Sequence, residues 1–527
     1  MMTPLTQLPE WQALNTHYQT QFPIRLTDLC QIPHRFAQCS ARLNGILVDF
    51  SKHFFTEETQ HLLISLANAC HLNQAIADLF SGEKINTTEN QPALHTALRN
   101  VTRSVLSVDG HNVMTDVRQI LQKMTQWVDA VNNQTYRGYT NQPITDVVHI
   151  GIGGSALGPQ LVTQALAHYA THLNIHFVSS PDGAQWNHVC RHLNPATTLF
   201  LIVSKSFSTL ETLTNAHRAK QWFSEKTRNP DAFNAHFIGV SADMAKMTAF
   251  GIHPDRQFPL WHWVGGRYSV WSTAGLTIAL SIGSERFKSF LHGATLADEH
   301  FQQTPWQHNI PVMLALLDFW YIHFFAVKSW VVLPYSSRLA QLPRYLQQLF
   351  MESNGKSITH TGERVNYPTG IVFWGEEGSS AQHSFFQLLY QGTQWIPVEF
   401  VVPVQSPHGH DRTLANALAQ ARHLMVGNDT LTAKAPHCHV PGNIPSTMIL
   451  LSELNPSTMG TLLALYEHRT FVQSVLWNIN AFDQWGVQLS REIPDYLLPA
   501  LQNNSDLTEL DLDDSTRHLI LYARSLL

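Results

Sequence analysis

Two loops of this chain combine small residues with hydroxyl groups, and each stands between an apolar run and a predicted helix. Residues 151–155 follow the apolar run 147–150, and residues 204–209 follow the run 199–203. A loop without bulky side chains that opens a helix presents free backbone N–H groups, which bind anions. Two such loops after successive strands of one sheet would converge at its carboxyl edge, where α/β proteins bind ligands. The pattern therefore predicts an anion site.

The hydroxyl groups narrow the choice of anion. Hydroxyl groups can donate hydrogen bonds to a small phosphate group, so we expect a phosphorylated metabolite as the ligand. The two loops carry five of them, on Ser155, Ser204, Ser206, Ser208 and Thr209. The competing interpretation is an NAD-dependent oxidoreductase, because the first loop has the Gly-x-Gly-x-x-Ala spacing of a dinucleotide fingerprint and an aspartate ends the next strand. The second loop argues against this interpretation, because a pyrophosphate does not need it. A glycine-rich turn without function is the remaining alternative.

Three further residues could do acid–base or charge chemistry. Arg267 follows two glycines, which would let its guanidinium face developing negative charge, although a solvated surface arginine fits equally well. Glu352 stands in the last turn of a predicted helix, where the helix dipole disfavours a carboxylate, and this favours a function. His383 is a lone histidine, which more often packs than reacts unless it has a partner. The residues alone leave all three open between function and structure.

The composition indicates a globular cytoplasmic protein. Its 527 residues are too many for one core, and 44% are apolar while 14% are charged. A net charge of −6 without a basic block argues against nucleic acid and membrane surfaces as partners. Five cysteines without a Cys-x-x-Cys pair indicate a reducing compartment, and the polar N-terminus lacks the apolar core of a signal peptide.

Neither a membrane segment nor a metal site is expected. The most apolar stretch, 311–327, is too short to span a bilayer and contains an aspartate and a histidine, so it predicts a buried helix. The histidine-containing loops 408–411 and 437–439 lack further ligands at zinc-like spacing.

The elements that must position the candidate residues alternate between strands and helices. Parallel strands are predicted at 147–150, 175–179, 199–203 and 237–240, and a second set at 330–333, 370–374 and 398–402. The expected fold class is α/β, with two doubly wound parallel sheets in three-layer αβα domains and additional terminal helices. The predicted divisions are a helical segment packed on the second α/β unit at 1–115, a first α/β domain at 116–297, a second at 298–498 and a helical tail at 499–527.

Seven blocks of the sequence, in order along the chain, resemble the glucose-6-phosphate isomerase family. They lie at 84–89 with 93–99, 150–159, 204–216, 265–269, 351–356, 382–393, and 465–469 leading to 482–487. The resemblance implies two sugar-isomerase domains that interconvert glucose 6-phosphate and fructose 6-phosphate in glycolysis and gluconeogenesis, without a metal or an organic cofactor. It also implies a homodimer with a shared active site.

The resemblance assigns roles residue by residue. Glu352 corresponds to the base that moves a proton between C2 and C1, Arg267 to the cation beside the enediolate, and His383 to the ring-opening residue contributed by the neighbouring subunit. Gln348 and Gln484 correspond to positions that line the sugar. The phosphate-binding loops correspond to Gly154, Ser155, Ser204, Lys205, Ser206, Phe207, Ser208 and Thr209.

One position departs from the family pattern. The family continues Glu-Leu-Gly-Lys after Asp-Gln-Trp-Gly-Val, and its lysine assists ring opening, whereas this chain reads Gln-Leu-Ser-Arg and ends the motif at Arg491. Arginine keeps the positive charge but does not donate its proton near neutral pH. We therefore expect ring opening to depend more on His383. A catalytically weakened sugar-phosphate-binding regulatory protein is the alternative function.

Overall fold

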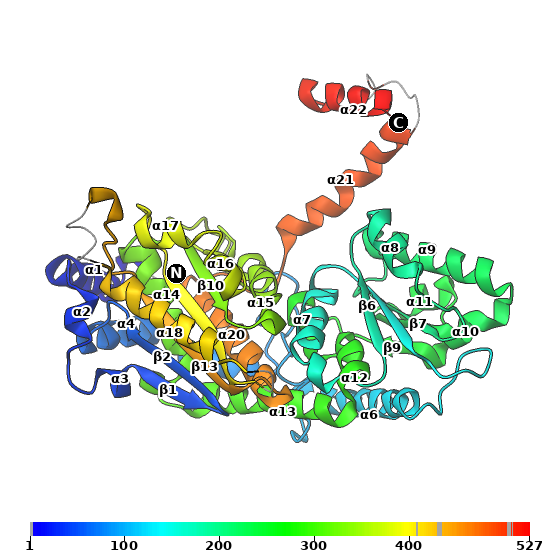
Figure 1. The fold of residues 1–527 in the computed structure, drawn as a ribbon, viewed down its shortest axis with the longest axis horizontal. Coiled ribbons are helices and arrows are strands. Elements are labelled where there is room, and N and C mark those ends of the chain that lie inside the picture. Colours follow the sequence, from blue (N-terminus) through cyan, green and yellow to red (C-terminus); the bar gives the residue numbers. More distant parts are fainter. Residues whose placement is uncertain (1–3, 407–408, 429–434, 503–506, 508–509, 527) are drawn as a thin grey trace. The chain divides into compact units, whose positions relative to one another are not determined.

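The computed structural model describes residues 4–406, 409–428, 435–502, 507 and 510–526, without the side chains of 489–496. The chain divides into two units, Met1–Phe482 and Asp483–Leu527. The first unit contains two large sheets (Figure 1) and a short ribbon of β3 (Ser107–Val108) and β4 (His111–Asn112).

The first sheet has five parallel strands in the order β6-β5-β7-β8-β9. They are β5 Asp146–Ile150, β6 Asn174–Val178, β7 Thr198–Val203, β8 Phe237–Ser241 and β9 Gln257–Pro259. The four strands predicted from apolar runs are confirmed, whereas the three-residue β9 was missed because it is too short to form a run. The neighbouring helices are α6 Val113–Asn132, α7 Leu157–Ala165, α8 Gly183–Cys190, α9 Leu210–Thr227, α10 Phe233–His236, α11 Met244–Phe250 and α12 Leu276–Ile282.

Both faces of this sheet are covered by helices. Leu199 and Leu201 of β7 belong to one apolar core, and Phe200 and Ile202 belong to another on the opposite face. Successive side chains of a strand point to opposite faces, so a central strand with two covered faces is apolar throughout. The predicted three-layer αβα arrangement is confirmed for this sheet.

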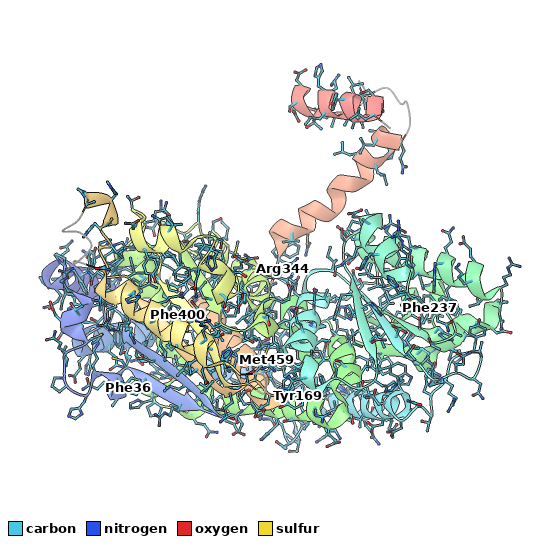
Figure 2. The ribbon with its side chains drawn as sticks, viewed as in Figure 1. Phe36, Tyr169, Phe237, Arg344, Phe400 and Met459 are labelled. Atoms are coloured by element: carbon cyan, nitrogen blue, oxygen red, sulfur yellow. The ribbon has the colours of Figure 1, made fainter. Side chains whose placement is uncertain are left out.

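The second sheet is mixed, with the order β1-β2-β13-β12-β10-β11. Its strands are β1 Ser40–Leu43, β2 Ile46–Lys52, β10 Ser329–Pro334, β11 Val372–Gly375, β12 Val398–Gln405 and β13 Ser446–Glu453. The last four are parallel, as expected, and β13 is an addition to the three that were predicted. Figure 2 shows Phe237 of the first sheet and Phe400 of the second, which lie in separate cores. The helices that follow these strands are α15 Leu342–Leu346, α16 Gly378–Ala381, α17 Phe386–Gln391 and α18 Asp411–Val426.

The N-terminal segment differs from the helical segment that the sequence predicts. β1 and β2 form an antiparallel hairpin that extends the second sheet through β13. Asn44 and Gly45 form its two-residue turn, with φ of 44° and 75°. Asn-Gly favours such a turn because both residues tolerate positive φ. The segment also contains α1 Pro9–Gln21, α2 Leu26–Leu29, α3 Arg35–Gln38, α4 Glu57–Ala69 and α5 Leu72–Ser81.

Three of the long helices of the first unit pack on one another. α13 (Ser284–Gln303) packs along α20 (Pro456–Leu476), which also contacts α14 (Ile310–Phe324). Glycines allow the close approach of α13 and α20: a Cβ at Gly460 would lie 1.9 Å from the carbonyl oxygen of Phe290. Because α13 runs without a break from Ser284 to Gln303, the predicted boundary at 297/298 lies inside this helix. The prediction of a buried helix at 311–327 is confirmed by α14, which is buried along nearly its whole length.

The second unit consists of α21 (Trp485–Gln502) and α22 (Asp514–Leu526). Ala500, Leu507 and Ile520 form its small core. In neither unit do the described residues include a helix that is both long and apolar enough to cross a bilayer.

Candidate functional site

The two predicted anion loops lie side by side. β5 and β7 are neighbours in the first sheet, with Ile150 opposite Ile202, so the loops that follow them leave the same sheet edge. The first loop makes a 3₁₀ turn at Gly153–Ser155 before α7. The second leads directly into α9, whose N-cap residue Thr209 makes no side-chain capping bond. The backbone N–H groups at this helix end are thus not satisfied by that side chain.

The first loop contacts the segments that carry two other candidates. A Cβ added at Gly154 would lie 2.2 Å from the carbonyl carbon of Gly266 and 2.6 Å from the backbone nitrogen of Arg267. A Cβ added at Gly153 would lie 3.2 Å from Nε2 of Gln348. At Gly154 only a residue without a side chain permits this approach, and the first loop thus lies against both the Arg267 turn and the Gln348 side chain.

The second loop is organised by its own hydroxyl groups. Ser204 Oγ donates to Thr209 Oγ1 at 3.3 Å, and Ser208 Oγ donates to Ser206 Oγ at 2.8 Å. The side chain of Lys205 is linked to another segment, because its Nζ donates to the carbonyl oxygen of His262 at 2.8 Å.

Phe207 differs from its neighbours in the second loop. Its ring is buried in the apolar core beneath the loop, and its φ is 45°. Its backbone alone is therefore placed to face a ligand.

His149, which was not among the predicted site residues, supports the first loop. Its Nε2 lies 2.8 Å from the carbonyl oxygen of Ser155, and its Nδ1 lies 2.7 Å from Oγ1 of Thr277. Burial lowers the pKa of His149 to about 4, so the ring is neutral, donates from Nε2 and accepts at Nδ1. The histidine thus fixes the first loop from below. A polar residue inside the apolar run 147–150 was the available signal.

Arg267 and Glu352 face each other beside these loops. Arg267 lies in the 3₁₀ turn Gly266–Trp271, and Glu352 ends the π-helical turn Gln347–Glu352. Arg267 Nη1 lies 3.5 Å from Glu352 Oε2, and the side chains are 1% and 17% exposed. Nε of Arg267 donates to Ser353 Oγ at 2.6 Å, and its Nη2 donates to the carbonyl oxygen of Ala481 at 2.5 Å. The guanidinium is therefore held rigidly, while the carboxylate remains accessible.

This arrangement can do proton-transfer chemistry next to a bound anion. A carboxylate that is open to solvent can accept a proton from a substrate carbon, and a fixed cation stabilises the negative charge that develops. Helical π-turns occur frequently at functional sites, because the wider turn redirects side chains. Among the described residues, no group of three histidine, cysteine or acidic side chains is arranged to hold a metal ion.

Three candidates are not joined to this cluster within the first unit. His383 is exposed in the turn between α16 and α17, and its ring makes no hydrogen bond or ion pair with the described part of the chain. Gln484 and Arg491 belong to the second unit. Gln484 directly precedes α21, and Arg491 lies within that helix. The side chain of Arg491 lies outside the described residues.

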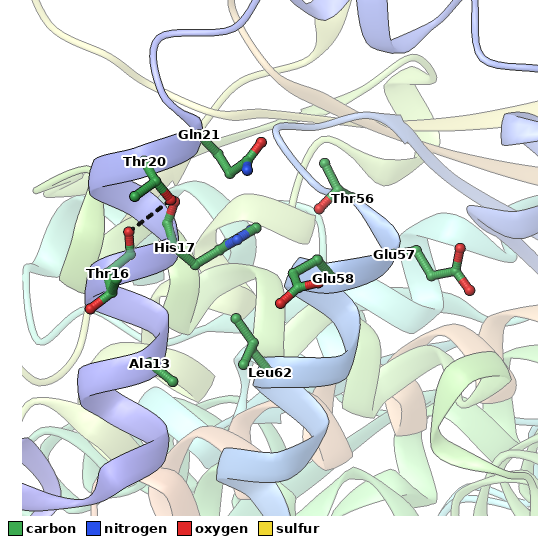
Figure 3. A pocket seen from close by; sticks show the side chains of 9 residues that line it. All are labelled: Ala13, Thr16, His17, Thr20, Gln21, Thr56, Glu57, Glu58 and Leu62. Carbon is green, nitrogen blue, oxygen red and sulfur yellow. Dashed lines mark hydrogen bonds between the residues drawn. The ribbon is translucent and has the colours of Figure 1, made fainter.

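A separate cavity lies far from these residues in the sequence. It has a volume of about 710 Å³ and is formed by α1 and α4 (Figure 3). Thr16, His17, Glu57 and Glu58 are among its lining residues. None of the candidate site residues lines it.

Comparison with known proteins gives a consistent result. A family model described as phosphoglucose isomerase matches residues 49–520. A glucose-6-phosphate isomerase from Chlorobium luteolum is 44% identical over 539 residues, covering 98% of this chain and 97% of that protein, and one from Shewanella halifaxensis is 46% identical over 531 residues, covering 97% of each. The crystal structure of a glucose-6-phosphate isomerase from Chlamydia trachomatis superposes on this chain with a TM-score of 0.88 at 28% identity. The superposition covers 99% of each chain.

Proposed function

The chain belongs to the phosphoglucose isomerase family, and from that premise we propose how its residues share the reaction. The protein interconverts glucose 6-phosphate and fructose 6-phosphate, a step of glycolysis and gluconeogenesis. An aldose–ketose shift moves one proton between adjacent carbons and uses the carbonyl of the substrate as the electron sink. The protein must therefore supply a base, a cation for the enediolate oxygen and an acid–base group for ring opening.

Glu352 is the base and Arg267 is the cation. The observation that carries this assignment is their separation of 3.5 Å, next to a loop of the expected anion site. Glu352 takes the proton from C2 and returns it to C1, and Arg267 stabilises the charge on the enediolate oxygen. A positioned general base contributes typically about 10²–10⁴-fold, so the preorganised charge of Arg267 supplies a substantial further part.

The phosphate group is bound between the two loops. Backbone N–H groups at the start of α7 and α9 and the hydroxyl groups of Ser155, Ser204, Ser206 and Thr209 surround it. The absence of a side-chain cap at Thr209 supports this assignment, because the first N–H groups of α9 then need another acceptor. Gln348 lies beside Gly153 and is placed to contact the sugar.

Ring opening is assigned to His383 of a second copy of the chain, with Arg491 as a hydrogen-bonding group. The exposure of His383 in its turn supports a role at a subunit interface. Gln484 completes the sugar-binding residues. The protein thus acts as a cytoplasmic homodimer with a shared active site, and its five free cysteines fit a reducing compartment.

Exchange of the C2 hydrogen of glucose 6-phosphate with solvent tests the function. Glucose 6-phosphate labelled with deuterium at C2 is incubated with the protein, and label loss is followed by NMR. We expect exchange and formation of fructose 6-phosphate without any added cofactor. Binding without exchange would indicate a regulatory protein, and turnover that requires a nicotinamide would indicate an oxidoreductase; either result would overturn the proposal.

A further inference from the structure

A buried charge cluster joins Glu467 and His468 of α20 to Asp298 of α13 and to Arg99. Arg99 donates to both oxygens of Asp298, at 2.9 and 2.5 Å, and to Oε2 of Glu467 at 2.5 Å. His468 Nε2 lies 2.7 Å from Asp298 Oδ1. All four side chains are at most 2% exposed. One guanidinium therefore serves two carboxylates in the interior.

Glu467 connects this cluster to the Arg267 turn. The indole Nε1 of Trp271 donates to Glu467 Oε1 at 2.8 Å and lies 3.1 Å from Oε2. Trp271 is the last residue of the 3₁₀ turn Gly266–Trp271, in which Arg267 is the second. The guanidinium carbon of Arg99 also lies 4.8 Å from the centre of the Trp271 ring. Arg267 and Glu467 are thus joined by one short, rigid segment of backbone and one buried hydrogen bond.

The same helix also holds the turn of Glu352. Asn354 Nδ2 donates to the backbone carbonyl of Thr470 at 3.1 Å and to Gln473 Oε1 at 2.8 Å. Thr470 and Gln473 lie three and six residues after Glu467 on α20. The two turns that carry Arg267 and Glu352 are therefore both attached to one helix.

We propose that Glu467 is a positioning residue for Arg267 and acts through Trp271. The proposal rests on the proposed role of Arg267 at the enediolate. A buried carboxylate is weak evidence for a stability role, because apolar replacements of buried ion pairs are often neutral or stabilising. Position is the more demanding requirement, since a misplacement of about 1 Å can lower a reaction rate about 10²-fold.

The test compares two variants that weaken the link with one that does not contact it. Trp271→Phe removes the N–H donor and keeps an aromatic ring. Glu467→Gln leaves a single acceptor oxygen for the two donors, Arg99 and Trp271. Asp298→Asn alters the same buried cluster without contacting Trp271, and serves as the matched control. Steady-state kinetics are measured together with the affinity for a phosphorylated sugar hydroxamate, a planar anionic analogue of the enediolate, and for inorganic phosphate.

We expect kcat to fall about tenfold in Trp271→Phe and in Glu467→Gln, with KM within about twofold of the unchanged chain. Hydroxamate affinity should fall by a similar factor, and phosphate affinity should not change. Asp298→Asn should keep kcat within about twofold. The double variant Trp271→Phe/Glu467→Gln should have the same kcat as either single variant, because both substitutions break the same hydrogen bond.

Several outcomes would overturn the inference. An unchanged kcat in Trp271→Phe would do so, even if Glu467→Gln does not fold. An equal loss of kcat in Asp298→Asn would show general loosening of the core. Arg267→Gln separates this inference from the proposed function: if that variant keeps full kcat, the role of Arg267 is itself wrong, and if only Arg267→Gln loses activity, the inference alone fails.

Discussion

The accessible carboxylate of Glu352 beside the buried guanidinium of Arg267 is the chemical centre of this protein. Their 3.5 Å separation does not depend on a direct short hydrogen bond, because Arg267 is held by Ser353 and by the Ala481 carbonyl. The carboxylate can therefore exchange protons without releasing the cation. A buried cation with fixed partners costs little reorganisation when negative charge develops nearby.

At Arg491 the chain departs from its family, and the consequence can be measured. We expect Arg491→Lys to isomerise cyclic glucose 6-phosphate at an equal rate or up to about tenfold faster, because lysine can donate a proton that arginine retains. The measurement is kcat with the cyclic sugar as substrate. A large loss of activity would show instead that the surrounding helix has adapted to arginine.

At the scale of elements, the loops were predictable and the Arg267–Glu352 pair was not. Apolar runs followed by glycine and serine marked β5, β7 and their loops, because period and composition are local properties. The proximity of Arg267 to Glu352 depends on α13, α14 and β10 between them, and no local pattern encodes it. Only the resemblance to the family assigned both residues to one site.

Some elements were missed although the sequence contained their signals. The Asn44-Gly45 pair directly before the apolar run 46–48 predicts the hairpin of β1 and β2, which the helical interpretation of the N-terminal segment overlooked. The predicted boundary at 297/298 lies within α13, which packs along α20. Likewise, the polar residue His149 within the apolar run 147–150 was a visible signal in the sequence.

At the scale of the whole molecule, buried neutral histidines make stability depend on pH. Burial lowers the pKa of His53 and His323 to about 3 and that of His149 and His300 to about 4. Their unfolded pKa is about 6.5, so the unfolded chain binds more protons below that pH. The stability they contribute is complete above pH 6.5 and is lost as the pH falls toward 4. Between pH 7 and pH 5, each of these histidines lowers the free energy of unfolding by roughly 2 kcal/mol.

Urea unfolding between pH 5 and pH 8 checks this expectation. The unfolding midpoint should fall steeply below pH 6.5. His323→Gln should reduce that slope while retaining an acceptor for the indole N–H of Trp477, which donates to His323 at 2.8 Å. A midpoint that does not vary with pH would mean that the buried rings gain protons without penalty.

Proton transfer by Glu352 is the claim on which the other assignments depend, and one variant tests it directly. Glu352→Gln keeps the size of the side chain and removes the base. The measurement is the rate of C2 hydrogen exchange in glucose 6-phosphate, with binding of the sugar phosphate followed in parallel. We predict that exchange falls by about 10²–10⁴-fold or more while binding is nearly unchanged. Exchange at the original rate would show that another residue removes the proton.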